Sequence, residues 1–237
     1  VAQHFRKGRA FLAGDAAHIH SPAGGQGMNT GIGDAINLAW KLAAVIAGRA
    51  RDDLLDSYEA ERIGFARRLV ASTDRAFTFA TSEGRLAAFV RMYLAPIVIP
   101  TAFKFDAVRK FAFRTVSQTA INYRGSRLSR GSDGGVQGGD RLPWVQADGS
   151  DNFAPLTVIG WQVHVYGAAK PALAAWCEQQ HVPLHVFPWR GEYEAAGLAR
   201  GVLYLLRPDT YVALAEASGT AEALDRYFGD QGIRPAP

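Results

Sequence analysis

The 237-residue sequence predicts a mixed α/β (α+β) chain with two domains, and three observations lead to this prediction. The first third combines a short apolar run, a loop rich in Gly and Pro, and a long helical pattern. Residues 126–139 are rich in Gly, Ser and Arg, which is typical of a linker. Short strand and helix patterns alternate after it. We therefore expect domains at 1–130 and 138–237, with enough apolar residues (48%) for sizeable cores.

The first domain opens with a motif that suits ligand binding. Residues 10–13 are apolar and of strand length, so they are expected to form a buried strand. Asp15 follows at the tip, where a carboxylate can bind sugar hydroxyls. The glycines of Gly24–Gly27 let the backbone approach a flat ligand and turn its N–H groups toward an anion. A helix is expected to begin near Met28.

The start of that helix favours negative charge. Its first N–H groups have no partner within the helix, and the helix dipole adds positive potential. Gly27, Met28 and Asn29 lie at this point, so an anionic group would be stabilised without Lys or Arg. Together with Asp15, they predict a site for a polyhydroxylated, partly anionic ligand. Met28 itself is interpreted as a packing residue.

Apolar residues recur at helical spacing after this start and predict one buried face. Gly48 is the expected C-cap, and Asp34 is an acid placed early, where the dipole favours it. The residues of the predicted face are Ile32, Ala35, Ile36, Ala39, Leu42, Ala43 and Ile46.

A second helix is predicted from a cap at Asp52 or Asp53. Glu59 and Glu61 resemble catalytic carboxylates, but they lie beside Arg62 on the same helix. Ion pairs on the helix surface are the favoured interpretation.

Residues 86–103 are strongly apolar and allow a membrane helix as one interpretation. Arg91 interrupts the run, and Pro96 and Pro100 are expected to break it. The length is at the lower limit for a span. We therefore expect no membrane span, but amphipathic helices packed on the first domain or on a neighbouring subunit.

The second domain is expected to follow the order strand, helix, strand, hairpin and helix, which is thioredoxin-like. Thioredoxin chemistry needs a C-x-x-C pair. Cys177 is the one cysteine of the chain and lies within a helix pattern, so we expect a packing residue and a domain that stabilises the fold or the oligomer. The expected elements are strands 156–159, 161–166 and 183–187, helix 170–180, a hairpin of 201–206 with 211–214 across 207–210, and helix 220–228.

Composition limits the remaining function classes. The net charge is +4, from Arg residues that are scattered rather than clustered, so no nucleic-acid partner is expected. A single cysteine excludes an intramolecular disulfide framework and fits a reducing cytoplasm. His18 and His20 have a spacing found in metal sites, but no Cys or ordered set of carboxylates accompanies them. No metal is expected, and His18 is interpreted as bonding the loop backbone.

The opening motif closely resembles the second flavin-binding motif of the FAD-dependent aromatic hydroxylases, the para-hydroxybenzoate and phenol hydroxylase-like class A flavoprotein monooxygenases. In the C-terminal domain, residues 139–144 (GDRLPW) and 205–215 (LLRPDTYVALA) resemble the thioredoxin-like extra domain of the larger members. The residues of the first match are Gly14–His18, Pro22, Gly24–Gly27, Asn29, Asp34, Ala35, Asn37, Leu38, Trp40 and Lys41.

The resemblance implies FAD as cofactor, NAD(P)H as reductant, and an aromatic substrate, phenolic or polycyclic, hydroxylated with O2 through a flavin C4a-hydroperoxide. It implies that Asp15 holds the ribityl hydroxyls, that Gly27 to Asn29 face the pyrimidine edge, and that the loop around Pro22 lines the oxygen side. The cofactor-binding residues implied are Asp15, Pro22, Gly24, Gly25, Gly27, Met28 and Asn29. A second copy of the chain, forming a homodimer, is a further candidate partner.

The family's first flavin motif, G-x-G-x-x-G, does not precede Gly14. We therefore expect the C-terminal part of a longer enzyme, inactive on its own and weak in FAD binding. No catalytic general base is identifiable, so the catalytic residues stay unassigned. The alternative is a non-catalytic remnant or assembly module with a thioredoxin-like domain that has no redox activity.

Overall fold

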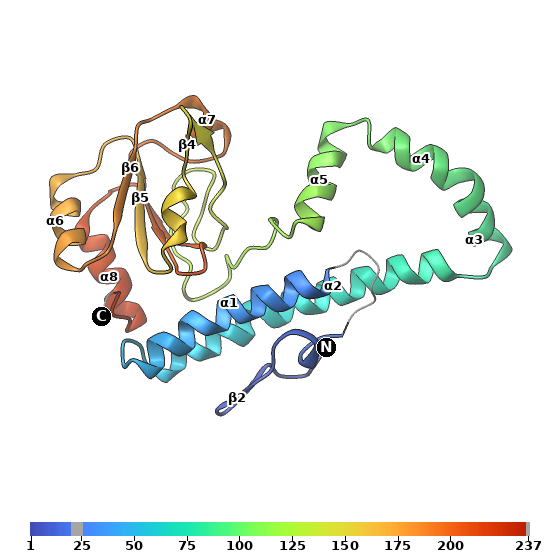
Figure 1. The fold of residues 1–237 in the computed structure, drawn as a ribbon, viewed down its shortest axis with the longest axis horizontal. Helices are drawn as coiled ribbons and strands as arrows, with labels where there is room; N and C mark the ends of the chain where they lie inside the picture. Colours follow the sequence, from blue (N-terminus) through green and yellow to red (C-terminus); the bar gives the residue numbers. More distant parts are fainter. Residues whose placement is uncertain (20–25, 236–237) are drawn as a thin grey trace. The chain divides into compact units, whose positions relative to one another are not determined.

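The computed structural model describes residues 1–19 and 26–235, which form two compact units (Figure 1). The first unit consists of residues 1–35 and 62–121, and the second of residues 36–61 and 122–237. Helices α1 (Gly27–Ile46) and α2 (Asp56–Thr81) each contribute residues to both units. Neither unit is therefore a single continuous stretch of the chain.

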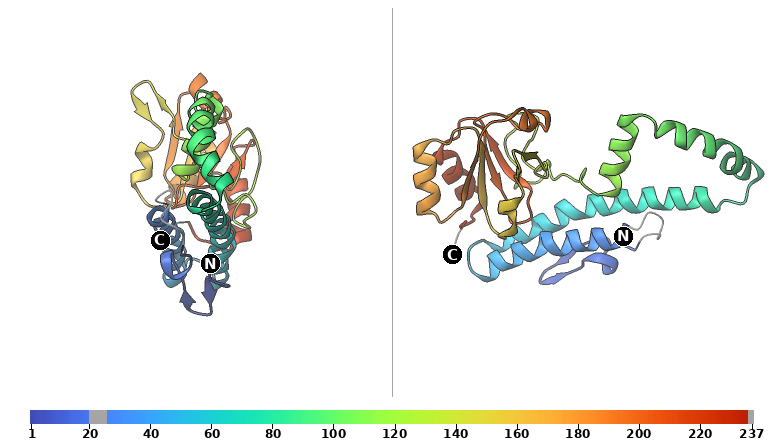
Figure 2. Two further views of the ribbon diagram at one scale, coloured as in Figure 1. Left: turned by 90° about the vertical axis from the view of Figure 1, so that its right-hand side faces the viewer. Right: turned by 45° about the horizontal axis from the view of Figure 1, so that its top comes forward.

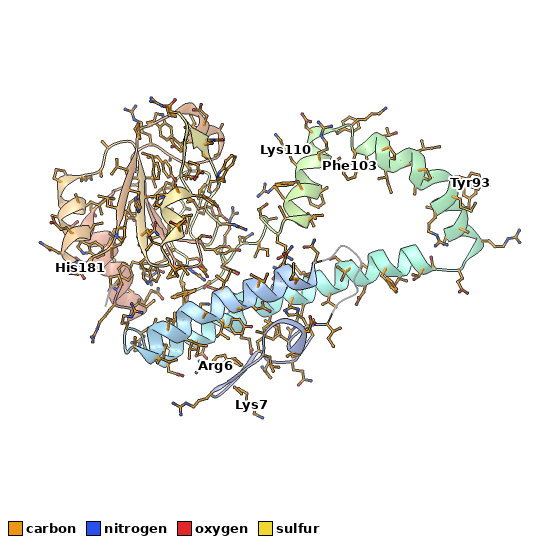
Figure 3. All side chains as sticks on the ribbon, in the orientation of Figure 1. Arg6, Lys7, Tyr93, Phe103, Lys110 and His181 are labelled. Atoms are coloured by element: carbon orange, nitrogen blue, oxygen red, sulfur yellow. The ribbon has the colours of Figure 1, made fainter. Side chains whose placement is uncertain are left out.

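The first unit opens with a small antiparallel hairpin of β1 (Arg6–Lys7) and β2 (Ala10–Phe11). The prediction of a buried strand over 10–13 is wrong: only two residues pair, and Ala10 is exposed. The strand that pairs with residues 10–11 is β1, which is basic, and Figure 3 shows its residues Arg6 and Lys7 on this hairpin. The buried residue at this hairpin is Phe5, which directly precedes β1.

Helix α1 begins and ends where the sequence predicts. It starts at Gly27, next to the expected Met28. Gly48 follows its end with a φ of +67°, a conformation that favours glycine. The Gly48 N–H donates to the Val45 carbonyl (3.0 Å) and the Arg49 N–H to the Ala44 carbonyl (2.8 Å). These bonds satisfy the last carbonyl groups of the helix, so Gly48 is confirmed as its C-cap.

The buried face of α1 is not the predicted apolar one, and it combines polar residues with Leu38, Trp40 and Ala44. The apolar positions of the expected face are largely exposed, including Ile36 (50%) and Ile46 (82%). Asp34, Asn37 and Lys41 are buried in their place. Burial of such groups requires hydrogen bonds or opposite charges. Helix α1 meets this requirement through ion pairs with α2 and, in the second unit, through hydrogen bonds from Asn37 and Trp40 to Asp209.

The chain from the end of α1 to Val116 is largely helical. A 3-10 turn over Asp52–Leu55 precedes α2, and both expected cap residues lie in this turn. The later helical segments are α3 (Arg85–Phe89), a π-helical turn (Val90–Leu94), α4 (Ala95–Ala102) and α5 (Asp106–Val116).

The apolar segment Arg85–Ala102 is long and apolar enough to cross a membrane, and none of it is buried. Figure 3 labels Tyr93 in the π-helical turn and Phe103 directly after the end of α4. The two prolines do not divide the segment as predicted. Pro96 lies in the first turn of α4, where a missing N–H is tolerated, and Pro100 lies inside that helix.

The second unit contains a four-stranded sheet in the order β6-β5-β7-β8. Parallel strands β5 and β6 are joined through α6, and β7 and β8 form an antiparallel hairpin. Two cores lie on the two faces: α6 and α8 cover one, and α7 with residues 136–147 covers the other (Figures 1 and 2). The bounds are β3 (Gln146–Ala147), β4 (Ser150–Asp151), β5 (Gln162–Tyr166), α6 (Pro171–Gln179), β6 (Leu184–Phe187), α7 (Gly191–Ala195), β7 (Leu203–Leu206), β8 (Val212–Glu216) and α8 (Ala221–Gln231).

Most of the expected elements of this unit are confirmed, and Cys177 is a buried core residue as expected. The strand predicted at 156–159 is wrong. A 3-10 turn covers Ala154–Thr157, and Ile159 is 82% exposed. The run is apolar, but no neighbouring strand pairs with it in the sheet of this unit.

Residues 126–139 are a packed segment rather than the predicted linker. The Arg130 N–H donates to the Ala213 carbonyl (2.8 Å), and the Gly139 N–H donates to the Val212 carbonyl (2.7 Å). A Cβ at Gly131 would lie 1.8 Å from the Ala215 carbonyl oxygen. The glycines therefore allow this segment to lie close against strand β8. A glycine-rich composition is also typical of flexible linkers, so the composition alone did not distinguish the two structures.

A buried ion cluster organises the second unit around the turn between β7 and β8. Arg207 lies in this turn and donates to both carboxylate oxygens of Glu61, at 2.7 and 2.9 Å. Lys41 donates to Glu61 at 2.8 Å, and Asp209 accepts from Arg207 at 2.6 Å. The indole N–H of Trp40 also bonds Asp209, at 3.1 Å. The prediction that Glu61 forms a surface ion pair is therefore wrong.

Charge balance makes this cluster stable in spite of its burial. Desolvation acts against the charge of Glu61, but Arg207 and Lys41 together hold the pKa of that carboxyl well below its usual range. Desolvation lowers the pKa of Lys41 to about 8, against the opposing attraction of Glu61. Two cations and two anions share the site, so removing one charge leaves a buried ion uncompensated.

We predict that Glu61→Gln lowers the free energy of unfolding by about 3–5 kcal/mol, because Arg207 and Lys41 lose their shared counter-charge. Urea unfolding followed by circular dichroism measures this change. Asp74→Asn, at an exposed position of α2, is the control and should change stability by less than about 0.5 kcal/mol. Equal effects of the two substitutions would contradict the importance of the cluster.

We predict that acid destabilises the second unit through His164. Burial and then the neighbouring His185 lower the pKa of His164 to about 3, and its Nε2 has no hydrogen-bond partner within the described part of the chain. The unfolded chain binds a proton here near pH 6.5, so stability falls as pH drops from about 6.5 toward 3, by up to about 1.4 kcal/mol per pH unit. His164→Phe should flatten this slope in urea titrations, whereas His181→Asn, at an exposed histidine, should retain it.

Candidate functional site

The Gly-Asp motif forms a short turn that packs directly on α1. Residues Gly14–Ala16 make one 3-10 turn, and Gly14 has a φ of +58°. A Cβ at Gly31 would lie 3.3 Å from the Gly14 Cα, so only small residues let the two backbones approach this closely. The Gly14 N–H donates to Asp34 Oδ2 at 3.0 Å. The turn is thereby seated one helical turn beyond the start of α1.

Asp15 and the start of α1 are available to a ligand. The Asp15 side chain is exposed on this turn, and Asn29 is exposed on the first turn of the helix. Gly27 is half-buried, and no acidic residue lies in that first turn. Met28 is 74% exposed, so the prediction of a packing residue is wrong. An exposed carboxylate therefore lies on a turn that packs against the first half of a 20-residue helix, whose start carries positive potential.

The other implied ligand-binding residues lie outside the described residues. Pro22, Gly24 and Gly25 belong to the segment 20–25, as do His20 and Ala23. Two described residues lie close to this segment: His18 is two positions before it, and Gln26 directly follows it. Each of these two residues is fixed by hydrogen bonds to other parts of the first unit.

His18 is held by the carboxylate of Asp34. Its Nε2 lies 2.6 Å from Asp34 Oδ2, and both side chains are buried. A carboxylate accepts hydrogen bonds only, so Nε2 carries the proton in this contact. The interpretation of His18 as a residue that bonds the loop backbone did not include this carboxylate partner.

Arg62 occupies the other side of the same carboxylate. Its Nε donates to Asp34 Oδ1 at 2.6 Å, and its Nη2 donates to the Thr30 carbonyl at 3.0 Å. A Cβ at Gly33 would lie 3.1 Å from Nη2, so the glycine makes room for the guanidinium. Arg62 is buried, which overturns the prediction of a surface ion pair.

Gln26 is fixed by the chain that follows α5. Its Nε2 donates to the Val116 carbonyl at 3.0 Å, and Gln118 Nε2 donates to Gln26 Oε1 at 2.9 Å. Gln118 also reaches Thr30 Oγ1 at 2.9 Å. The start of α1 is therefore held by polar contacts from a segment about 90 residues later in the chain.

The Asp34 carboxylate is ionised in this setting. Burial alone would raise its pKa, but the hydrogen bond from His18, the charge of Arg62 and the Gly14 N–H together lower it. A buried charge with this complete set of donors stays charged without bulk water. The ionised carboxylate of Asp34 therefore holds Gly14, His18 and Arg62 in place through its hydrogen bonds.

Sequence reasoning missed Asp34, His18 and Arg62 as members of one network. The sequence did contain one indication that another segment packs here. Gly31 and Gly33 lie inside a helical pattern, and each costs a helix about 1 kcal/mol relative to Ala. Such glycines indicate a close approach by another part of the chain. The partners themselves were not predictable, because they come from a separate turn and a separate helix.

The donor set of this region fits a flavin cofactor better than a metal. Within residues 1–19 and 26–235, no group of three or more His, Cys, Asp or Glu side chains is placed to hold a metal ion. An exposed carboxylate and the N–H groups of a helix start instead suit a ligand with hydroxyl groups and an electron-rich edge. No general base for catalysis is evident among the side chains described above.

Comparison with known proteins identifies the family. The family model described as "FAD binding domain" matches residues 1–73. The chain is 34% identical to 6-methylpretetramide 4-monooxygenase of Streptomyces rimosus, over 98% of this chain and 48% of that protein. It is 40% identical to pentachlorophenol 4-monooxygenase of Sphingobium chlorophenolicum, over 60% of this chain and 25% of that protein.

Solved structures give the same result. CabE, an aromatic hydroxylase from angucycline biosynthesis, superposes with a TM-score of 0.71 at 31% identity, over 99% of this chain and 46% of that one. The rebeccamycin biosynthetic enzyme RebC with reduced flavin gives a TM-score of 0.73 at 29% identity, over 98% and 46%. The chain thus spans about half the length, or less, of the relatives it matches. Its flavin motif, fold and relatives agree, and the chain is similar to part of an FAD-dependent aromatic hydroxylase of the class A flavoprotein monooxygenases.

Proposed function

We propose that this chain is the C-terminal part of an FAD-dependent, NAD(P)H-using monooxygenase that hydroxylates an aromatic substrate, phenolic or polycyclic, in the cytoplasm. The observation that carries the proposal is the Gly14–Ala16 turn, seated on α1 one helical turn beyond its start. Bound FAD, once reduced, would supply the activation of O2. The polycyclic and phenolic compounds named for the relatives support the substrate class.

The proposed role of Asp15 is to accept hydrogen bonds from the ribityl hydroxyls of FAD. Its carboxylate is exposed, and its turn is fixed by Gly14. The N–H groups of Gly27, Met28 and Asn29 would face the electron-rich edge of the flavin ring. A comparable main-chain or amide donor contributes about 3 kcal/mol in other oxyanion sites.

Pro22, Gly24 and Gly25 would complete this site from the segment between its two anchors. In the family pattern that segment lines the side where oxygen and substrate meet. The anchors at His18 and Gln26 support this role, because both ends of a six-residue segment are held firmly. The proposed parts of the chain are 1–130, the flavin domain with its helical extension, and 138–237.

We further propose that residues 138–237 form a thioredoxin-like domain without redox chemistry. Its sheet combines a parallel β5-α6-β6 unit with an antiparallel hairpin and a closing helix. Burial raises the pKa of the Cys177 thiol to about 11, so little reactive thiolate forms near neutral pH. Its function would be to stabilise the fold or a homodimer.

A second candidate is a non-catalytic assembly module. The exposed apolar helices over Arg85–Ala102 favour it, because such surfaces mark interaction sites. FAD binding separates the two candidates, since an assembly module requires no flavin.

We predict that Asp15→Ala, in the protein that carries this chain, weakens FAD binding by about tenfold or more, equivalent to one lost charge-assisted hydrogen bond. The melting temperature without FAD should not change, because the Asp15 side chain is exposed. Flavin absorbance per protein and fluorescence titration measure the two effects. Asp74→Ala is the control at another exposed acid, and normal flavin content in Asp15→Ala would exclude the proposed role.

We predict that the chain of residues 1–237 alone binds FAD weakly or not at all, because its proposed contacts reach only the flavin end of the cofactor. Titration of the purified chain into FAD, followed by flavin fluorescence, tests this. Tight binding with strong quenching would show that the contacts in this chain suffice, and would contradict the assembly-module alternative.

A further inference from the structure

Asp34 is the point where three separate segments of the first unit meet. Its carboxylate accepts from the Gly14 main chain at 3.0 Å, from His18 at 2.6 Å and from Arg62 at 2.6 Å. Gly14 directly precedes Asp15, and His18 lies two residues before the segment 20–25. One buried side chain therefore fixes the turn that carries Asp15, the proposed partner of the ribityl hydroxyls, and also holds His18.

Glu61 provides the internal comparison for this arrangement. Both carboxylates have side-chain exposures of 1%, and both pair with an arginine. The partners of Glu61 are side chains: Lys41, Asn37, Ser126 and Arg207. Asp34 also takes a main-chain N–H, from the residue adjacent to Asp15. Only Asp34 is therefore placed to control the position of the turn.

We propose that Asp34 is a positioning residue for the flavin site, acting on Asp15 through the Gly14 main chain without touching the cofactor. The inference rests on the proposed role of Asp15. Arg62 holds the carboxylate from the opposite side and ties it to the Thr30 carbonyl of α1. The Asp15 carboxylate is thus set in place before the cofactor arrives, and FAD binding does not have to order the turn.

Gly31 offers a way to move the turn without changing any charge. A Cβ at this position would lie 3.3 Å from the Gly14 Cα, which is backbone and cannot rotate away. Gly31→Ala therefore displaces the turn by a few tenths of an ångström. The same substitution favours the helix itself, so a loss of FAD affinity would not reflect a weaker helix.

The test uses the FAD-loaded protein that carries this chain, with four variants: Asp34→Asn, Gly31→Ala, Asp15→Ala and the control Glu61→Gln. FAD affinity by fluorescence titration, the visible spectrum and reduction potential of the bound flavin, and the melting temperature without FAD are measured. Asp34→Asn should weaken FAD binding about tenfold or more and shift the flavin spectrum or potential. Glu61→Gln should lower the melting temperature but leave affinity within about twofold.

A double-mutant cycle shows whether Asp34 acts through the turn. In Asp15→Ala, the further change Asp34→Asn should have much less effect on FAD affinity, because the group it positions is gone. Additive effects would overturn the inference, as would unchanged affinity and spectrum in Asp34→Asn. Should that variant fail to fold, Gly31→Ala decides: about fivefold weaker binding supports the inference, and wild-type binding overturns it. Normal FAD affinity in Asp15→Ala would instead refute the proposed function, and the inference with it.

Discussion

Two buried carboxylate–guanidinium pairs are the constraint on which the rest of this structure depends. Asp34 pairs with Arg62 in the first unit, and Glu61 pairs with Arg207 in the second. Charges leave water at a large cost, and each pair is tolerated only because further donors complete it. The helices α1 and α2 therefore meet through a polar face. Their relative register is set by directional bonds, which allow far less sliding than apolar contact would.

This constraint explains how a binding region arises without a long strand. The Gly-Asp motif makes only a single 3-10 turn, and no strand of its own supports it. Its position comes from Asp34 and from the close approach to Gly31. A ligand site on a helix and an anchored turn is well ordered because the supporting bonds are buried. The exposed Asp15 carboxylate takes no part in these bonds, which agrees with the cofactor role proposed for it.

Glycine has three different functions along the chain. Gly48 ends α1 through a positive φ, which sequence alone predicts. Gly31 and Gly33 instead make room for a backbone and a guanidinium. Gly131 allows contact with strand β8. The last two functions depend on which part of the chain approaches each glycine. A glycine-rich composition alone therefore does not distinguish a flexible segment from a closely packed one.

Local sequence determined the features whose causes are local. These are the start and end of α1, the turn at 207–210 with its hairpin, the helix that contains Cys177, and the motif of the flavin hydroxylases. Tertiary structure decided which helix face is buried, that Glu61 and Arg62 leave the surface, that 126–139 packs on β8, and that 156–159 forms no strand. The physical reason is that burial depends on partners distant in the chain. Apolar spacing predicts a helix whatever lies beside it, whereas the buried side of α1 bonds Arg62 and Glu61 on α2, and Asp209, which lies 169 residues after Trp40.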